Sequence, residues 1–215
     1  PPGDIAAARP RVFLEVGCGV GNTAFPLLAA DSAAIVHCCD FSQRAVALVR
    51  RRAEALPPAE GARVHPFVCD VTCEPLTAHV PAGSVDVATL VFVLSAISPT
   101  AMEAAVRNVS SVMRPGAAGR VLVRDYAAGD LAQERFATKD RQRLSDNFYV
   151  RGDGTRAYYF TPESLTGLFQ KHGMLLEELA VHERAITNRG QGVRMDRRWV
   201  QASFASAAVP ADALP

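Results

Sequence analysis

The chain has 215 residues, of which 49% are hydrophobic and 21% charged, and its formal net charge is +1. This length suits one large α/β domain with a sizeable core. The nearly balanced charge excludes a global electrostatic attraction to nucleic acid, so any such binding must come from a local basic patch. No apolar run approaches the ~20 residues that a membrane-spanning helix needs, and no membrane partner is expected.

The composition of the chain ends indicates the domain boundaries, and the cysteines indicate the cellular location. Residues 1–10 are rich in proline and alanine and are expected to form a flexible lead-in, before a single domain over 11–205 and a flexible tail over 206–215. The first residue is Pro1 rather than methionine, so we expect a segment upstream. Five cysteines without a Cys-x-x-Cys pair favour reduced thiols and a cytoplasmic location, with organelles and the nucleus left open. No metal site is expected, because packing explains His65, Cys69 and Cys73 better than metal binding does.

A glycine-rich turn near the start of the domain is the main functional signal. The apolar run Val12–Val16 predicts a short buried strand, and residues 23–30 resume at helical spacing. Strand, glycine turn and helix together bring backbone N–H groups against a nucleotide-like ligand. The spacing is Gly-x-Gly-x-Gly rather than the dinucleotide Gly-x-Gly-x-x-Gly, and Glu15 stands two residues before the first glycine, which points to S-adenosylmethionine rather than NAD. A purely structural turn is the alternative. The cofactor-binding candidates in this turn are Gly17, Gly19, Gly21 and Asn22.

Further along the chain, strands and helices alternate. Strands are expected at Ile35–Cys39, Val64–Val68, Val85–Leu94 and Arg120–Tyr126, and helices from Gln43 to about Leu56 and over Thr100–Met113, with a loop at 57–61. This alternation is typical of a parallel, doubly wound sheet, which binds ligands at the carboxyl ends of its strands.

Two aspartates follow the second and third strands. Asp40 is placed to accept hydrogen bonds from a ribose diol; helix capping is its structural alternative, but Ser42 already supplies a cap. Asp70 suits a polar clamp on an adenine edge with Val71 as an apolar wall, and an Asx turn explains Asp70 almost as well. Phe41 and Val91 are further cofactor-contact candidates, and Val91 is equally well explained as a core residue.

The segment 127–160 differs from the rest and is expected to insert a substrate-binding region. Gly152-Asp153-Gly154 predicts a β-hairpin, after which Thr161 caps a helix to about His172 and two antiparallel edge strands follow at about 175–185 and 194–205. Basic and aromatic residues are interleaved in this segment, as in proteins that grip single-stranded nucleotides. They are Arg135, Lys139, Arg141, Arg143, Arg151, Arg156, Phe148, Tyr149, Tyr158, Tyr159 and Phe160. A hairpin that buries its aromatic rings and solvates its arginines is an equal alternative.

These residues resemble a known family. The stretches Leu14–Asn22, Cys39–Ser42, Phe92–Ile97, Arg124–Tyr126 and Asn147–Arg156 are similar to those of the methyltransferase-like enzymes that make 3-methylcytidine in tRNA. The resemblance covers residues 11–205. It implies a Rossmann-like class I methyltransferase fold of the α/β class, with a seven-stranded, mostly parallel sheet, helices on both faces and an inserted β-hairpin. It further implies S-adenosylmethionine as the donor and a cytidine of the tRNA anticodon loop as the acceptor. Members of that family also carry an upstream segment that helps to close the cofactor pocket and bind tRNA.

The substrate side yields a second set of expectations. Asp125 is the catalytic candidate, because a carboxylate can stabilise the positive charge of the methylated base. Arg124 beside it faces the substrate or pairs with a neighbour, Arg151 and Arg156 would hold phosphates, and Phe148 or Tyr149 would stack on a flipped-out base. The expected partner is tRNA, bound by a monomer, with an accessory protein such as an aminoacyl-tRNA synthetase left open. Two rival functions remain: a class I enzyme acting on small molecules, and a non-catalytic scaffold.

Overall fold

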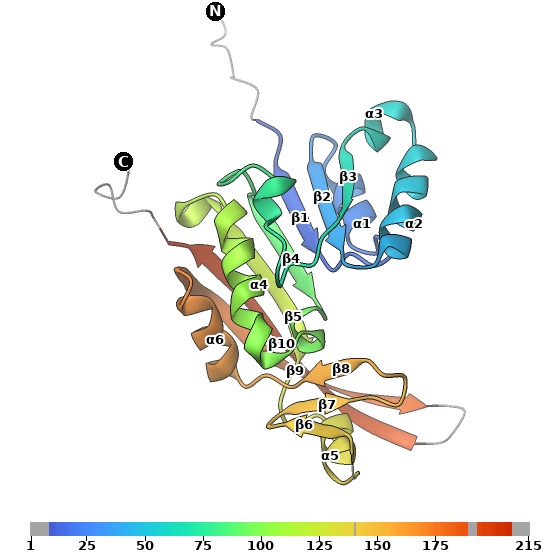
Figure 1. Ribbon diagram of the computed structural model, residues 1–215, viewed down its shortest axis with the longest axis vertical. Helices are drawn as coiled ribbons and strands as arrows, with labels where there is room; N and C mark the ends of the chain where they lie inside the picture. Colours follow the sequence, from blue (N-terminus) through green and yellow to red (C-terminus); the bar gives the residue numbers. More distant parts are fainter. Residues whose placement is uncertain (1–8, 140, 189–192, 208–215) are drawn as a thin grey trace, which may run out of the picture.

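A seven-stranded sheet forms the centre of the computed structural model, which describes residues 9–139, 141–188 and 193–207 (Figure 1). Its strands are β1 (Val12–Val16), β2 (Ile35–Asp40), β3 (Val64–Val68), β4 (Val87–Val91), β5 (Arg120–Tyr126), β9 (Met174–Asn188) and β10 (Val193–Ser206). They lie in the order β3-β2-β1-β4-β5-β10-β9. The first five strands pair in parallel, whereas β10 pairs antiparallel with both β5 and β9. The predicted fold is therefore confirmed.

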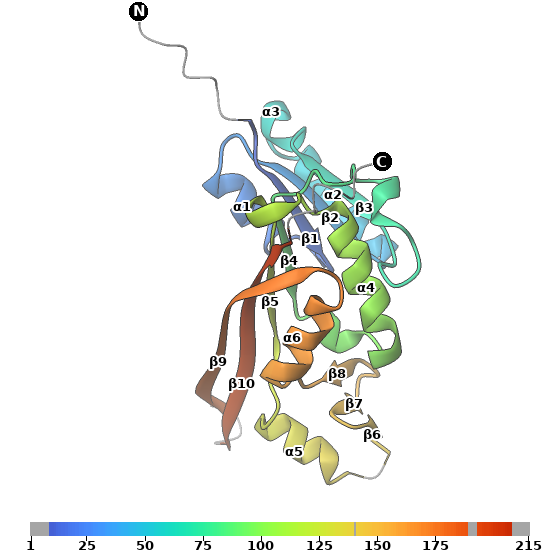
Figure 2. The same ribbon diagram turned by 90° about the vertical axis from the view of Figure 1, so that its left-hand side faces the viewer.

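Helices cover both faces of this sheet, as Figure 2 shows for α1 and α4. The helices are α1 (Ala24–Ala30), α2 (Gln43–Glu54), α3 (Pro58–Gly61), α4 (Pro99–Val112), α5 (Leu131–Ala137) and α6 (Pro162–Gln170). Side chains of α1 and α2 pack with Phe13 and Val36 on one face. Side chains of α4 and α6 pack with Leu14 and Leu90 on the other. Strands β1 and β4 therefore read as nearly continuous apolar runs because both of their faces are largely covered, whereas β5 alternates between buried and more exposed residues.

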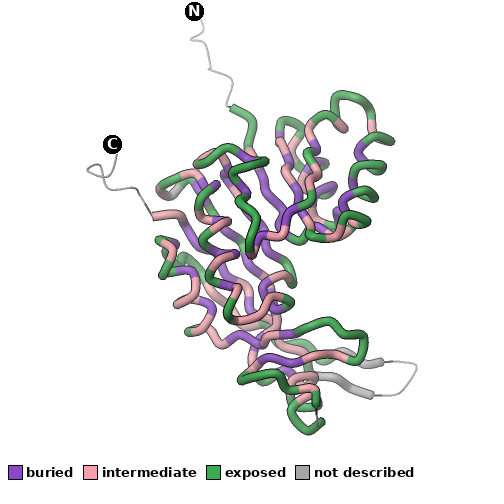
Figure 3. Tube along the Cα trace, viewed as in Figure 1, coloured by how far each residue is buried: buried purple, intermediate pink, exposed green. Residues whose placement is uncertain are grey.

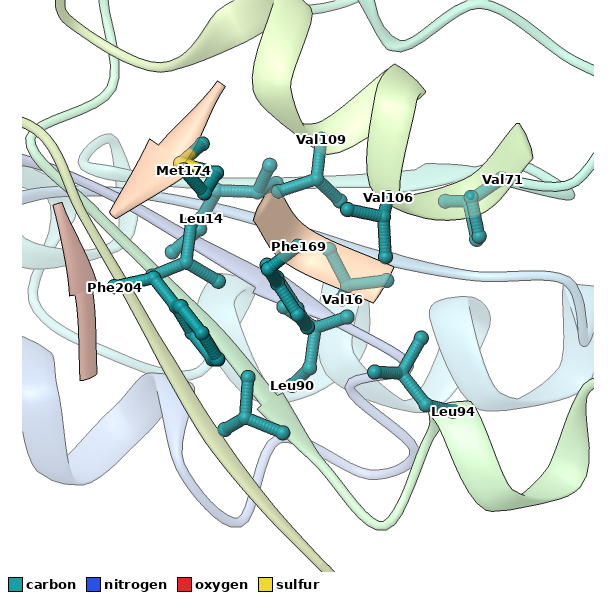
Figure 4. Close-up of a cluster of buried hydrophobic side chains, with 14 of the residues drawn as sticks. Leu14, Val16, Val71, Leu90, Leu94, Val106, Val109, Phe169, Met174 and Phe204 are labelled. Atoms are coloured by element: carbon teal, nitrogen blue, oxygen red, sulfur yellow. The ribbon is translucent and has the colours of Figure 1, made fainter. Parts of the chain in front are cut away.

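The larger core lies under α4 and α6 (Figure 4). Phe169 of α6 stacks on Phe204 of β10 with ring centroids 4.2 Å apart, and both rings are fully buried. Figure 3 shows the burial concentrated along the central strands, with the outer surface of α2 exposed. This core fixes the strand ends at which ligands of such sheets bind.

The inserted segment forms a small layer beyond the carboxyl ends of the parallel strands (Figure 1). It contains α5 and a three-stranded antiparallel sheet in the order β6 (Arg143–Ser145), β7 (Phe148–Val150) and β8 (Arg156–Tyr158). The predicted hairpin is β7–β8, with residues 151–155 as its turn. Neither α5 nor β6 was expected, because residues 131–137 bury no side chain fully and so leave no helical apolar pattern.

Two other boundaries differ from expectation. Residues 58–61 form the short helix α3 rather than a loop. The fourth strand is shorter than predicted, since Val85 forms an isolated bridge to Met113 and the strand ends at Val91, where Phe92 takes a positive φ. Of the ends expected to be flexible, residues 1–8 and 208–215 lie outside the described part. Within that part, no helix is both long and apolar enough to cross a membrane.

Candidate cofactor site and substrate edge

The glycine turn has the backbone conformation that its sequence requires. Gly17, Gly19 and Gly21 have φ of 67°, 52° and 83°, a left-handed region that other residues rarely adopt. A Cβ on Gly17 would lie 2.5 Å from Val93, and one on Gly21 would lie 2.6 Å from the ring of Phe25. A Cβ on Gly19 would meet nothing within 4 Å. The turn therefore packs tightly at its two ends and leaves open space at its centre.

Glu15 holds this turn from beneath. Its carboxylate is buried and accepts a hydrogen bond of 2.7 Å from the N–H of Ala24, at the start of α1. Burial raises the pKa of Glu15, while hydrogen bonds from Thr23 and Ala24 oppose that shift. An acidic group beneath the N-terminus of a helix satisfies donors that would otherwise lack a partner. In the sequence, Glu15 was noted only as the acidic residue of the glycine motif. Its role in capping the N-terminus of α1 is seen only in the structure.

Asp40 connects the turn to the second strand. One carboxylate oxygen accepts the N–H of Gly19 at 2.9 Å, and the other accepts the N–H of Ser42 at 2.9 Å. Ser42 caps α2 by accepting from Ala45, as predicted. Each oxygen of Asp40 keeps a free lone pair, so the carboxylate can still accept from a ribose diol. Phe41, the next residue, is 78% exposed at the same strand end. Asn22 is also exposed, at the end of the turn.

The loop after β3 contains the second aspartate. Asp70 accepts hydrogen bonds from both the N–H and the hydroxyl of Thr72, which is the Asx turn of the structural alternative. These hydrogen bonds hold the pKa of Asp70 below its usual value. Val71 is buried in the larger core. Asn108 of α4 fixes this loop by donating to the carbonyls of Val71 and Glu74, a positioning role that no sequence pattern had indicated.

Asp125 occupies a different environment from the one expected. It is fully buried at the end of β5, and its oxygens accept from the N–H groups of Ser95 and Tyr126, each at 2.9 Å. Burial raises its pKa to about 6. A direct contact between this carboxylate and a substrate is therefore not what the structure presents, because both oxygens face the protein's own backbone.

Phe148 and Tyr149 also require a correction. Both rings are buried, Phe148 beside Tyr158 and Tyr149 between Phe136 and Tyr159. Neither presents a face on which a base could stack, so the alternative of buried hairpin aromatics describes them. Neighbouring residues of a strand point to opposite faces, so both faces of β7 are covered at Phe148 and Tyr149, which strand alternation alone did not reveal.

The arginines of the substrate side separate into packed and exposed groups. Arg124 and Arg151 are half-buried, with Arg151 4.9 Å from the centre of the Tyr126 ring and Arg124 5.5 Å from that of Trp199. Arg156, on β8, is exposed. Three further cations of the insert are also exposed: Arg135, Lys139 and Arg141. Arg143 is exposed too and pairs with Asp146. Among the described residues of the insert, the exposed cations therefore outnumber the exposed acids, which are Glu134, Asp146 and Asp153.

The cofactor candidates come together as the strand topology predicts. Each candidate lies at the carboxyl end of one of four neighbouring parallel strands, at one edge of the sheet. The strands and their candidates are β1 with Gly17–Asn22, β2 with Asp40 and Phe41, β3 with Asp70 and Val71, and β4 with Val91. The open space at Gly19, beside a carboxylate that holds free lone pairs, fits the ribose and amino acid portions of S-adenosylmethionine. Val91, 37% exposed at the end of β4, is placed to form an apolar wall. That each of these residues contacts the cofactor stays a prediction.

Two hollows adjoin some of these candidates, since Val71 lines one of them and Val91 lines the other. One, of about 360 Å³, lies between the loop that starts at Val71 and helix α4. The other, of about 440 Å³, lies on the face of β4, β5, β10 and β9 and is lined by Thr89, Leu122 and Gln201 among others. Neither is lined by the glycine turn.

A family model for a methyltransferase domain matches residues 14–118, which contain the glycine turn and both aspartates. Among solved structures, an S-adenosylmethionine-dependent methyltransferase from Methanosarcina mazei superposes with a TM-score of 0.74 at 16% identity and covers 94% of each chain. A Burkholderia thailandensis N1-methyltransferase solved with S-adenosylhomocysteine has a TM-score of 0.60 at 16% identity, covering 93% of this chain and 72% of the other. These structures show the fold. The chain has the fold of a class I methyltransferase domain.

Curated relatives narrow this class. The human tRNA N(3)-cytidine methyltransferase METTL2B is 45% identical over 205 residues, which are 94% of this chain and 51% of that protein. METTL2 of Danio rerio is 43% identical, over 97% of this chain and 57% of its own length. METTL6 of Rattus norvegicus is 44% identical, over 89% and 64%. By sequence, this chain is therefore similar over most of its length to these tRNA N(3)-cytidine methyltransferases. It spans about half the length of the first of these relatives.

Proposed function

We propose that this protein transfers a methyl group from S-adenosylmethionine to N3 of a cytidine in the anticodon loop of tRNA. The observation that carries this proposal is the extent of the match to the curated relatives, which aligns 205 residues at 45% identity. We call the sheet edge that contains the cofactor candidates the cofactor edge. Sequence similarity restricted to this edge would be compatible with any methyl acceptor. This likeness covers 94% of the chain, so it extends through the inserted segment and the β9–β10 pair.

The chemistry asks little of the protein beyond orientation. Bound S-adenosylmethionine supplies an electrophilic methyl group on a positively charged sulfur. Neutral cytosine has a lone pair on N3, so no residue has to remove a proton from it. We therefore assign to the chain the tasks of holding both reactants in line and of excluding competing acceptors.

Named residues divide these tasks between the two edges. Asp40 and the open backbone of the glycine turn at Gly19 would hold the donor, in the geometry described above. Arg151 and Arg156 would hold phosphates of the RNA. Methylation makes the cytosine cationic, and Asp125 would favour that charge through its field rather than by contact, because its pKa of about 6 leaves it mostly ionised at pH 7.

Partner and location complete the proposal. We expect tRNA to be bound by a monomer in the cytoplasm. The need for an accessory protein, such as an aminoacyl-tRNA synthetase, is decided by comparing turnover on the same tRNA with and without it.

The test is methyl transfer to tRNA followed by nucleoside analysis. Purified protein is incubated with unmodified tRNA and isotope-labelled S-adenosylmethionine, the tRNA is digested, and 3-methylcytidine is quantified by mass spectrometry. We expect 3-methylcytidine with the wild type and a loss of at least tenfold with Asp40→Ala. Asp31→Ala is the matched control, because Asp31 is a carboxylate at the opposite, amino end of β2 that pairs with Arg11. Label in another nucleoside, or in small molecules alone, would contradict the proposal.

A further inference from the structure

Three aromatic rings and three arginines gather at the carboxyl ends of β4 and β5 and against β10. We call this group the aromatic–arginine cluster; it consists of Phe92, Tyr126, Trp199, Arg124, Arg151 and Arg197. The ring centres of Phe92 and Tyr126 are 4.9 Å apart. The guanidinium carbon of Arg197 lies 5.7 Å from the Tyr126 ring centre and 5.9 Å from that of Trp199. The sequence had singled out only Arg124 and Arg151 from this group.

Phe92 is the residue of this cluster whose conformation most needs an explanation. Its φ is 57°, a region that bulky aromatic residues adopt rarely and at a cost. Its side chain is 37% exposed, so the ring is not there simply to fill the core. The backbone is held in this conformation by a hydrogen bond of 2.8 Å from the N–H of Phe92 to the carbonyl of Arg124. Strain of this kind concentrates at sites that bind ligands.

The position of Phe92 places it between the two edges of the site. The following residue, Val93, lies against Gly17 of the glycine turn. The segment Leu94–Ala96 packs against β8 of the insert. On its other side, the Phe92 ring faces Tyr126 at the end of β5. A flat group bound against Phe92 would therefore have the cofactor edge on one side and the basic insert on the other.

We propose that Phe92 is the ring on which the target base stacks, with Tyr126 as the adjoining wall; this rests on the function proposed above. A heteroaromatic base stacks on an aromatic face with little dependence on its identity, and a cytosine that becomes cationic on methylation gains a further attraction to that face. Phe92 thereby takes the stacking role that the sequence had assigned to Phe148 or Tyr149. Phe92 therefore orients the base for the reaction rather than selecting it.

Two substitutions separate the ring from the backbone. Phe92→Asn removes the ring, and asparagine tolerates positive φ better than most residues, so the strand end should keep its shape. Phe92→Tyr keeps the ring. Leu48→Ala on α2 is the control, because Leu48 is 39% exposed and lies far from the site in the fold. Each variant is assayed for methyl transfer to tRNA, for S-adenosylhomocysteine affinity by calorimetry and for melting temperature.

We expect Phe92→Asn to lower kcat/KM for tRNA by about 5- to 150-fold, the range that base–aromatic stacking supports. S-adenosylhomocysteine affinity and melting temperature should stay at the wild-type level. Leu48→Ala should keep its activity, and Phe92→Tyr, which restores a ring, should recover most of what Phe92→Asn loses. Unchanged kcat/KM in Phe92→Asn would overturn the inference. So would parallel losses of cofactor affinity and melting temperature, which indicate a structural role.

A second measurement separates failure of this inference from failure of the proposed function. An anticodon stem-loop RNA carrying 5-iodocytidine at the target position is irradiated in complex with the wild type, and the crosslinked peptide is sequenced. A crosslink at Phe92 or Tyr126 supports the inference. A crosslink elsewhere overturns it, even where the wild type makes 3-methylcytidine. Absence of 3-methylcytidine from wild-type reactions rejects the proposed function, whichever residue is crosslinked.

Discussion

The cofactor edge and the inserted segment lie at the same end of the sheet but are built from different contacts. At the cofactor edge the backbone forms much of the surface: the glycine turn leaves open space at Gly19, and Asp40 accepts the N–H groups of Gly19 and Ser42. In the insert, side chains make the structure, through buried rings and through Asp130, which is fully buried. A surface made of backbone depends on a few glycines and strand ends. A surface made of side chains depends on which rings are buried by their neighbours. Substitutions at the cofactor edge and in the insert should therefore have different effects.

Removal of the carboxylate of Asp130 should produce the largest loss of stability and should leave cofactor binding unchanged. Asp130 caps α5 through the N–H of Ala132, pairs with Arg197 at 2.8 Å and accepts the N–H of Arg198. Because Asp130→Ala leaves a half-buried arginine and two backbone donors without this partner, we expect a loss of about 3 to 5 kcal/mol in unfolding free energy. Urea denaturation gives the value.

A matched variant locates that loss. Asp130→Asn keeps an oxygen to cap α5 but removes the charge that faces Arg197, so it should lose less than Asp130→Ala. S-adenosylhomocysteine affinity measured below the unfolding transition should not change in either variant. A cofactor affinity that falls together with stability would show that the two edges are not independent.

Asp40→Ala should have the next largest effect, confined to the cofactor edge. Both the ribose contact and the link to the N–H of Gly19 are lost, and hydrogen bonds to a charged group contribute about 1.5 to 3 kcal/mol each. We expect S-adenosylhomocysteine affinity to fall by about 10- to 150-fold in calorimetric titration. Affinity for tRNA in filter binding should remain, and an equal loss of both would contradict a division between the edges.

The contrast between the two edges also explains how far the sequence could be read. Strand β1 was predicted residue for residue, because an apolar run followed by Gly17 leaves the chain no other regular structure. Helix α5 was missed because its residues bury little, although Asp130 before it was a readable cap. The positions of Phe148 and Tyr149 depend on Tyr158, Phe136 and Tyr159, and Trp199 reaches the site from β10, some 70 residues after Tyr126. Such contacts across the fold have no local pattern.

Smaller effects should come from the two arginines of the hairpin. Arg156→Ala removes an exposed cation and Arg151→Ala one that packs on Tyr126. If each contacts one phosphate, each variant should weaken tRNA binding by about tenfold at physiological salt and reduce the slope of log affinity against log salt by about 1. Binding of tRNA in a salt titration gives both numbers. Arg51→Ala is the control, since Arg51 is exposed in the last turn of α2, at the other end of that helix from Asp40. A slope that does not change in either hairpin variant would place the RNA elsewhere.

The smallest expected effect concerns the junction of the two edges, where Asp125 lies buried beneath Tyr126. Burial raises the pKa of this carboxyl from its ordinary 3.8 to about 6. The folded protein therefore binds a proton more tightly than the unfolded chain, so ionisation of Asp125 costs stability as pH rises from about 4 through about 6. Between pH 5 and pH 7 this group should remove about 1 kcal/mol of unfolding free energy. Asp125→Asn cannot ionise, and urea denaturation across this range should give a difference between variant and wild type that shifts in the variant's favour as pH rises. A difference independent of pH would mean that burial does not raise the pKa of Asp125 into this range.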